Sequence, residues 1–111
     1  MKKKHLVIKS HQPSFDYHLE LAKGELLKYE RKTTDVTGWI CCTTTGGKSC
    51  WIPENWVKIK ADQCEIMQDY NSKELQVEMG EIIELEFIES GWAWIRNTRK
   101  ESGWIPIECI T

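Results

Sequence analysis

The chain carries the stretches Gly38-Trp39-Ile40 and Cys50-Trp51-Ile52-Pro53 and repeats them as Gly91-Trp92-Ala93 and Gly103-Trp104-Ile105-Pro106. In both copies the proline follows the first tryptophan by 14 positions (53 − 39 and 106 − 92), and the copies are 53 positions apart (92 − 39). A period of this length in a chain of 111 residues predicts two small repeated units. We place them at residues 1–60, the first half, and residues 61–111, the second half.

Apolar residues recur with a period of two in both halves. Leu27 and Tyr29 fall on one face of a predicted strand, and Ile83, Leu85 and Phe87 do so at the corresponding place in the second half. Because side chains alternate between the two faces of a strand, this pattern predicts β-structure and not helix. Both halves are therefore expected to be all-β.

Glycine-containing turns separate the predicted strands. Gly24 and Gly80 each precede a glutamate, and Gly46-Gly47 marks a tight hairpin. A first strand is expected within residues 6–13, which close on a proline. No linker rich in proline, glycine or serine separates the halves, which are joined by residues 57–63 alone. Two closely linked units are expected.

The first tryptophan of each repeated stretch is expected on the surface. In strands of alternating pattern, Ile40 and Ala93 point to the core, so Trp39 and Trp92 point outward. Trp94 shares a face with Trp92. Contact with the other half or with a partner protein explains two neighbouring surface aromatics better than exposure to solvent does.

The charge balance and the hydropathy disfavour two classes of partner. The chain has 15 basic and 17 acidic residues and a formal net charge of −2, so no overall positive field attracts nucleic acid. No apolar run is long enough for an export signal or a membrane span. A cytoplasmic protein that binds neither nucleic acid nor membrane is expected.

The cysteines and histidines suggest no catalytic or metal centre. Cys41, Cys42, Cys50, Cys64 and Cys109 do not read as a disulfide framework without an export signal. No CxxC pair or nearby histidine completes a tetrahedral ligand set, so no metal or other cofactor is expected. The three histidines are scattered, without a partner placed for nucleophilic or acid–base chemistry. We therefore expect a protein that is not an enzyme.

Each half resembles an SH3 domain. The resemblance covers nearly the whole chain and rests on the order of its features: Leu-x-Leu or Leu-x-Val, a Gly-Glu turn, the Gly-Trp strand, and a Trp-Ile-Pro strand that leads to Val57 or Ile110. It implies two tandem SH3-like small β-barrels, closely linked. SH3 domains bind left-handed polyproline helices in a shallow aromatic groove, because such a ligand is already extended and loses little entropy on docking.

In the first half, the resemblance implies a groove formed by Trp39, Pro53, Asn55 and Trp56, of which the last stands where the family has a tyrosine. A lysine and a histidine replace the two tyrosines of the family's first strand. The loss of these aromatic walls removes the ridges between which prolines sit. Ordinary proline-rich peptides are therefore expected to bind weakly or not at all.

In the second half, Trp92 and Pro106 match the family pattern, and Tyr70 is placed as one retained tyrosine of the first strand. An ungapped alignment instead puts Met67 at that position. A glutamate and a cysteine replace the asparagine and the last tyrosine of the family's groove. The second groove is therefore expected to be the less complete.

Acidic loop residues pair with an arginine or lysine of the ligand in the SH3 family. The residues that the resemblance assigns to this role are Asp16, Glu20 and Asp35. An exposed ion pair contributes only about 0 to 1 kcal/mol, so these carboxylates would orient a ligand more than hold it.

The leading interpretation is a non-enzymatic adaptor that binds a protein partner, or an extended or proline-rich peptide, mainly through the first half. Two alternatives remain open. One is a bacterial SH3-like module that binds cell wall or glycan, because exposed tryptophans suit stacking on sugars. The other is a structural unit whose halves pack their tryptophan faces together or form a homo-oligomer.

Overall fold

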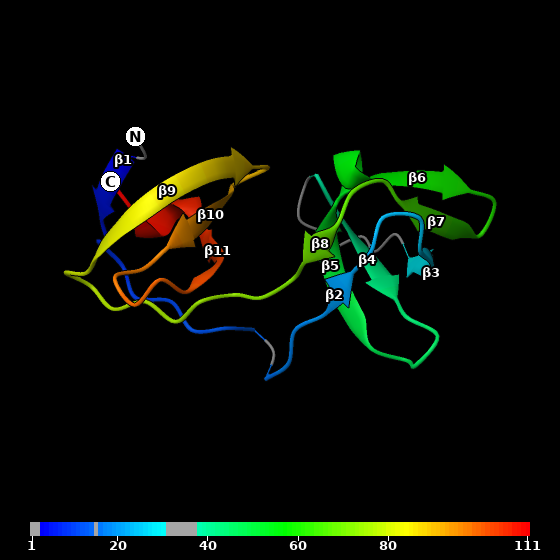
Figure 1. Cartoon of the computed structure of the whole chain (residues 1–111), viewed down its shortest axis with the longest axis horizontal. Coiled ribbons are helices and arrows are strands. Elements are labelled where there is room, and N and C mark those ends of the chain that lie inside the picture. The colour runs from blue at the N-terminus through cyan, green and yellow to red at the C-terminus, as the bar shows by residue number, and fades with distance from the viewer. Residues whose placement is uncertain (1–2, 15, 31–37) are drawn as a thin grey trace. The chain divides into compact units, whose positions relative to one another are not determined.

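The computed structural model describes residues 3–14, 16–30 and 38–111. Every regular element within these residues is a β-strand or a single turn of 3-10 helix, so the predicted all-β class is confirmed (Figure 1). In this described part of the chain, no helix has the length and apolar character needed to cross a membrane.

In chain order the elements are β1 (Lys3–Leu6), β2 (Glu20–Leu21), β3 (Leu26–Glu30), β4 (Trp39–Thr43), β5 (Ser49–Pro53), η1 (Glu54–Trp56), β6 (Val57–Lys60), β7 (Gln63–Ile66), β8 (Tyr70–Asn71), β9 (Ile82–Glu89), β10 (Trp92–Arg96), β11 (Ser102–Pro106) and η2 (Ile107–Cys109).

The chain folds into two compact units, and their boundaries differ from the predicted ones. Unit 1 consists of Met1–Tyr17 together with Lys73–Thr111, and unit 2 is His18–Ser72. The predicted boundary between residues 60 and 61 falls inside unit 2, next to the turn that joins β6 to β7. The physical reason is the strand pairing, because β1 and β7 each pair with strands of the opposite half.

Unit 1 is built on a four-stranded antiparallel sheet with the order β1-β9-β10-β11. β1 comes from the first half and lies along β9, with His5 opposite Ile83; Figure 1 shows this blue strand beside the yellow one. Beyond β1, Val7 forms a bridge with Ile110. Val7 is fully buried in a core that otherwise comes from the second half: Leu75, Val77, Ile83, Ala93, Ile95, Ile105, Cys109 and Ile110.

Unit 2 contains a five-stranded antiparallel sheet with the order β5-β4-β3-β7-β6 and a two-stranded sheet, β2-β8. β7 and β8 come from the second half, and β7 lies between β3 and β6, which come from the first. Ile66 and Cys64 of β7 are fully buried. Burial of a side chain such as Ile66 stabilises the fold by about 1.5 to 3 kcal/mol, so β7 is an integral part of this unit.

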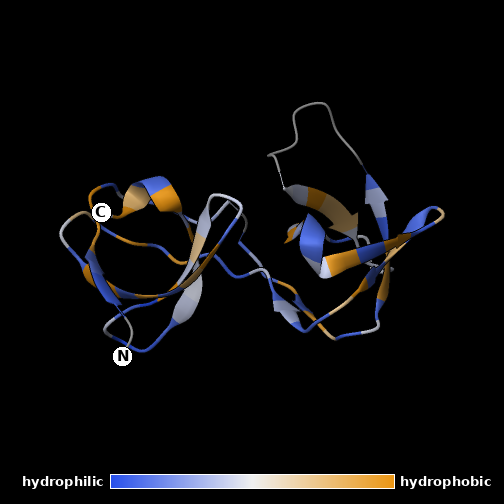
Figure 2. Ribbon diagram, turned by 90° about the horizontal axis from the view of Figure 1, so that it is seen from above, coloured by the Kyte–Doolittle hydropathy of each residue, from blue (hydrophilic) through white to orange (hydrophobic). Residues whose placement is uncertain are grey.

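The paired strands form open sheets. Among the described residues, the hydrogen-bonded strand orders run from one edge strand to another, and none returns to its first strand. The prediction of two tandem SH3-like small β-barrels, closely linked, is thus confirmed only at the level of an all-β fold. Figure 2 shows hydrophobic and hydrophilic residues following one another along the strands of both units, as the sequence pattern implies.

The two Gly-Glu turns form as predicted. Gly24 and Gly80 have φ angles of 95° and 99°, a region that glycine enters without steric cost. The glutamate after each glycine closes the turn, because its Oε1 accepts a hydrogen bond of 2.8 Å from the backbone N–H of Ala22 in one turn and of Glu78 in the other.

The predicted strand faces are correct for the core residues and wrong for Trp39. Ile40 and Ala93 are buried as expected, and Trp92 is half-buried. Trp39, expected to point outward, is only 5% exposed. It lies on β4, between β3 and β5. Residues on both faces of β4 are buried, so the alternation of side chains along this strand does not show which face points to the core.

Candidate functional site

Two aromatic side chains meet in unit 2. The rings of Trp56 and Tyr70 lie edge to face, with their centroids 5.6 Å apart and their planes at 86°. The Tyr70 hydroxyl donates a hydrogen bond of 2.7 Å to the backbone carbonyl of Trp51. Edge-to-face packing and a satisfied hydroxyl fix the tyrosine in one orientation. The pair joins η1 of the first half to β8 of the second.

The 3-10 turn η1 presents the tryptophan of this pair. Pro53 precedes the turn with φ −56° and ψ 130°, which ends β5 and turns the chain. The N–H of Glu54 donates to the Gly38 carbonyl over 2.8 Å, and the Trp56 carbonyl accepts from Met67 N–H over 2.9 Å. These bonds hold η1 at both ends. Pro53, which precedes η1, is fully buried.

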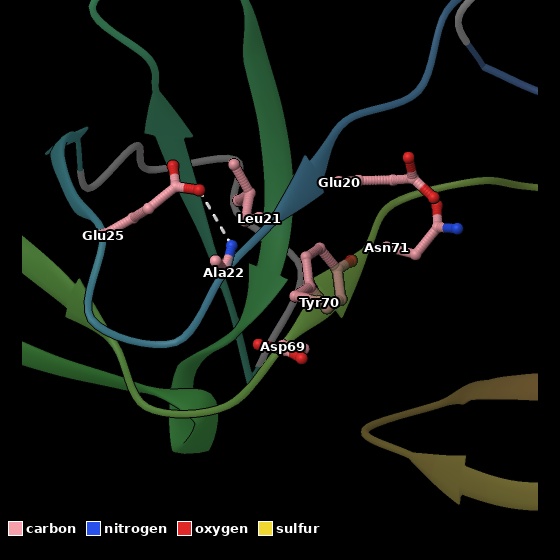
Figure 3. A pocket seen from close by; sticks show the side chains of 7 residues that line it. All are labelled: Glu20, Leu21, Ala22, Glu25, Asp69, Tyr70 and Asn71. Carbon is pink, nitrogen blue, oxygen red and sulfur yellow. Dashed lines mark hydrogen bonds between the residues drawn. The ribbon is translucent and has the colours of Figure 1, made fainter.

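A pocket of about 390 Å³ opens beside Tyr70 (Figure 3). Three of its seven lining residues are carboxylates, and none is basic. The lining residues are Glu20, Leu21, Ala22, Glu25, Asp69, Tyr70 and Asn71.

The three carboxylates are held by different means. Glu25 is fixed by its bond to the Ala22 N–H within the turn. Asp69 accepts a hydrogen bond of 2.9 Å from the backbone N–H of Lys23, and this bond ties the loop between β7 and β8 to the same turn. Glu20 is exposed on β2 and lies opposite Asn71 of β8. The arrangement favours a cationic group over an anionic one in this pocket.

Six predicted site residues lie in unit 2, and the structure brings some of them together. Tyr70 joins Trp56 in the aromatic pair and Glu20 in the pocket lining. Asn55 is exposed on η1, next to Trp56. Trp39 and Pro53 lie opposite each other in the β4–β5 pairing, and both are buried. Because both side chains are buried, they do not form exposed walls of a groove.

The other four described residues of the predicted site lie in unit 1. The Trp92 ring meets the His11 ring edge to face, with centroids 5.7 Å apart, and Trp92 pairs with Pro106 across β10 and β11. His11 Nε2 lies 2.8 Å from Glu74 Oε1. Asp16 is exposed and belongs to unit 1, whereas the residues of the acidic pocket belong to unit 2.

Trp94, expected to contact the other half or a partner protein, packs against aromatic side chains of unit 1. Its ring stacks on Phe87, with centroids 6.4 Å apart and planes at 19°, and meets Trp104 edge to face at 5.3 Å. Trp104 is 2% exposed. Trp94 is half-buried and belongs to an aromatic cluster with Phe87 and Trp104. Asp35, the remaining acidic residue of the prediction, lies outside the described residues.

Sequence reasoning missed five residues of the pocket lining, and three of them, Glu25, Asp69 and Asn71, have polar side chains. The repeated Gly-Glu turn contained the signal for Glu25, because the same turn occurs in both halves. Asp69 and Asn71 flank Tyr70 in the sequence, but they were assigned to the second half. Their place beside residues of the first half follows only from the pairing of β8 with β2.

The cysteines are chemically quiet in this fold. All five are buried with free thiols. Burial raises the pKa of the Cys50 thiol to about 12 and also raises the pKa of Cys42, whose Sγ lies 3.3 Å from that of Cys64. A protonated thiol is a poor nucleophile. In the residues that the structure describes, no group of three or more histidine, cysteine, aspartate or glutamate side chains is arranged to hold a metal ion.

Comparison of the chain with protein-family models, with curated proteins and with solved structures gave no match.

Proposed function

We propose that this chain is a non-enzymatic protein–protein interaction module of the SH3-like type, and that unit 2 binds an extended peptide carrying a basic residue. The observation that carries the proposal is the edge-to-face pair of Trp56 and Tyr70 beside a pocket lined by three carboxylates. The pair offers an apolar surface to prolines, and the pocket offers counter-charges to an arginine or lysine of the same ligand.

The expected ligand conformation follows from the shape of this surface. An extended polyproline helix has few conformations to lose on docking and stacks its rings on aromatic faces. Each exposed carboxylate contributes about 0 to 1 kcal/mol to an ion pair with the ligand, so the charges set the orientation of the peptide. The apolar contact supplies the remaining affinity.

The arrangement of elements in each unit supports the SH3-like part of the proposal. Each unit contains a first strand, a Gly-Glu turn, three successive antiparallel strands and a 3-10 turn, followed by a residue that pairs back onto the first strand. The interpretation differs from a simple tandem in one respect, because each first strand belongs to the opposite half of the sequence.

Unit 1 is the weaker candidate for peptide binding. At the end of its 3-10 turn, Cys109 is buried, whereas the corresponding residue of unit 2 is the half-buried Trp56. An ion pair of 3.5 Å between Lys9 and Glu108 lies next to this cysteine. Unit 1 therefore has no tryptophan at the position that Trp56 occupies in unit 2.

Titration with a peptide that combines a proline run with flanking arginines tests this proposal. In an ¹⁵N-labelled chain, the backbone signals of Asn55, Trp56 and Asn71 should shift. Trp56→Ala should weaken binding at least about tenfold, the equivalent of 1.4 kcal/mol, because it removes half of the aromatic pair. Glu20→Gln should weaken binding less, and only at low salt.

Phe87→Ala is the matched control, because this aromatic side chain is 40% exposed on unit 1 and takes no part in the proposed surface. It should bind the peptide like the unaltered chain. Shifts confined to unit 1, or equal loss of binding in Trp56→Ala and Phe87→Ala, would exclude the site in unit 2. A control peptide of the same length and charge, in which other residues replace the prolines, should bind through charge alone and lose its binding at high salt.

A further inference from the structure

The first strand of the chain occupies a defined position in unit 1. The N–H of Val7 donates to the Glu81 carbonyl and the Val7 carbonyl accepts from Gly80 N–H, both over 2.8 Å. The next residue, Ile8, donates its N–H to the carbonyl of Cys109 over 2.7 Å. The strand is thus bonded to the Gly-Glu turn on one side and to the 3-10 turn on the other.

The strand β7 makes the same set of bonds in unit 2. The N–H of Ile66 donates to the Glu25 carbonyl over 2.9 Å, and the Ile66 carbonyl accepts from Gly24 N–H over 2.7 Å. Met67 then donates its N–H to the carbonyl of Trp56 over 2.9 Å. Residues 66 and 67 therefore stand where residues 7 and 8 stand in unit 1, so β1 and β7 are equivalent strands exchanged between the halves.

The side chains of β7 suit the position that it occupies. Cys64 is opposite Leu27, is fully buried, and places its Sγ 3.3 Å from the Sγ of Cys42. The equivalent residue of β1 is His5, which is opposite Ile83 in unit 1. An imidazole in the place of Cys64 would bury a polar ring among sulfur and aliphatic atoms. The first half is therefore poorly suited to close on its own first strand.

β1 has partners of its own in unit 1. His5 Nδ1 lies 2.7 Å from the backbone carbonyl oxygen of Thr111, and the Thr111 hydroxyl accepts a hydrogen bond of 3.3 Å from the N–H of Leu6. Each half thus requires the other half for its first strand. Whether that other half belongs to the same chain depends on the connection between residues 60 and 63.

That connection is short and strained. β6 ends at Lys60 and β7 begins at Gln63, so the turn between these two strands consists of Ala61 and Asp62 alone. Ala61 has a φ angle of 55°, a left-handed conformation that a residue with a Cβ adopts at a cost. A short hinge under strain favours the exchange of segments between copies, because opening the hinge releases the strain and every other contact is made again.

We propose that this chain pairs with a second copy of itself by exchange of whole halves, with Ala61 and Asp62 as the hinge. Residues 1–60 of one copy then complete both units with residues 61–111 of the other. The pairings of β1 with β9 and of β7 with β3 and β6 are kept, and only the β6–β7 turn opens. At low concentration the two halves of one chain find each other first, because a short connection gives an effective concentration of the order of millimolar.

The thiols of Cys42 and Cys64 report which copy supplies β7. Cys42 belongs to the first half and Cys64 to the second, so a disulfide between them lies within one chain in the monomer and joins two chains in the exchanged dimer. Oxidised glutathione, present while the chain refolds and the thiols are accessible, supplies the oxidant: two thiols and one glutathione disulfide yield one protein disulfide and two molecules of glutathione. Each attack by a thiolate releases one glutathione thiolate.

The experiment refolds a mixture of ¹⁴N and ¹⁵N chains over a range of concentrations and maps the cross-linked peptides by mass spectrometry. Pairs of Cys42 and Cys64 peptides that carry different labels should appear in a dimer fraction that grows with concentration. Labels that always match, at every concentration up to the solubility limit, would overturn the proposal. A dimer without cross-links between Cys42 and Cys64 would overturn it as well.

Substitutions at the hinge give an independent readout. Ala61→Pro cannot adopt a positive φ, so it should hold the hinge open and lower the dissociation constant of the dimer by about 100-fold or more. Ala61→Gly removes the strain and should raise that constant at least about fivefold. If Ala61→Pro does not fold, the test is the comparison of the unaltered chain with Ala61→Gly. Equal dimer fractions in these two would contradict the role of Ala61 as a strained hinge.

Discussion

Tyr70 fixes the proposed binding surface at the scale of a single residue. Its ring packs against Trp56, and its hydroxyl donates to the Trp51 carbonyl over 2.7 Å. The side chain is 4% exposed, so the ring forms the floor of the surface and the indole of Trp56 its more accessible part. A residue from the second half thus determines how a surface of the first half is shaped.

Tyr70→Phe is expected to lower the free energy of unfolding by about 1 to 3 kcal/mol, because it leaves the Trp51 carbonyl without its partner. Urea unfolding measures this change. Tyr29→Phe is the matched control: its hydroxyl donates to the Ala61 carbonyl over 3.0 Å at an exposed site, where water replaces it. The control should change stability by less than about 0.5 kcal/mol. Equal effects of the two substitutions would contradict the buried role of the Tyr70 hydroxyl.

Glu65 provides a test of pH dependence. A hydrogen bond and charge attraction from Lys60 lower the pKa of its carboxyl from the ordinary 4.5. The stabilisation is present above the unfolded-state pKa and is lost as the pH falls through the lower folded-state value. Lys60→Met should therefore raise the Glu65 pKa and flatten the fall in stability below about pH 4.5.

Carboxyl ¹³C shifts of Glu65 as a function of pH measure this pKa directly. Lys58→Met is the control, because Lys58 faces the same glutamate across β6 and β7 but contributes least to lowering its pKa. A larger pKa change in Lys58→Met than in Lys60→Met would show that the ion pair is assigned to the wrong lysine.

At the scale of elements, the edge of β11 depends on close contact with the chain that enters unit 1 from unit 2. The Trp104 N–H donates to the Lys73 carbonyl over 2.8 Å, and the Leu75 N–H donates to the Trp104 carbonyl over 3.1 Å. A Cβ on Gly103 would lie 2.7 Å from Leu75 Cγ and 3.0 Å from the carbonyl oxygen of Lys73. The absence of a side chain at this glycine is what permits the contact.

Gly103→Ala should lower the free energy of unfolding by about 1 to 3 kcal/mol, because residues 73–75 must move away from β11. Thermal or urea unfolding measures the loss, and the NMR signals of Leu75 should shift. Gly46→Ala is the matched control, since its added Cβ would meet only Thr44 Oγ1, at 3.6 Å. A stability of Gly103→Ala equal to that of the control would contradict this packing.

The sequence predicts where strands lie better than it predicts their partners. The alternation of Leu27 and Tyr29 places β3, and the Gly-Glu turns are found as expected, because both are local features. The pairing of β1 with β9 joins residues that are about 80 positions apart and depends on side chains such as His5 and Cys64. In a repeated sequence, β1 and β7 could each occupy the position of first strand in either unit, so the sequence pattern alone does not show which unit each strand joins.

The candidate site shows the same division between local and long-range information. Asn55 and Trp56 follow the Trp-Ile-Pro motif, which fixes their place on η1. The position of Tyr70 requires the long-range pairing of β8 with β2 and was not expected in this unit. The outward orientation predicted for Trp39 failed because β4 is covered on both faces.

At the scale of the whole molecule, the exchanged strands make the two halves depend on each other. Residues 1–60 and 61–111, produced as separate chains, should bind each other when mixed and restore the unfolding transition of the intact protein, because each supplies a strand to the other's unit. Affinity capture of one tagged half and calorimetry of the mixture test this. If residues 1–60 alone unfold with the stability of the intact chain, the strand exchange is not required for folding.

In the sequence, unit 2 is inserted into unit 1, between residues 17 and 73. The two segments at the outer ends of the described chain are themselves bonded to each other, since Thr111 donates its N–H to the Leu6 carbonyl over 3.1 Å and Val7 bridges to Ile110. Tension applied at Lys3 and Thr111 therefore loads unit 1 first and must peel β1 from β9 before any force reaches unit 2. The proposed peptide surface is mechanically shielded until the outer unit has ruptured.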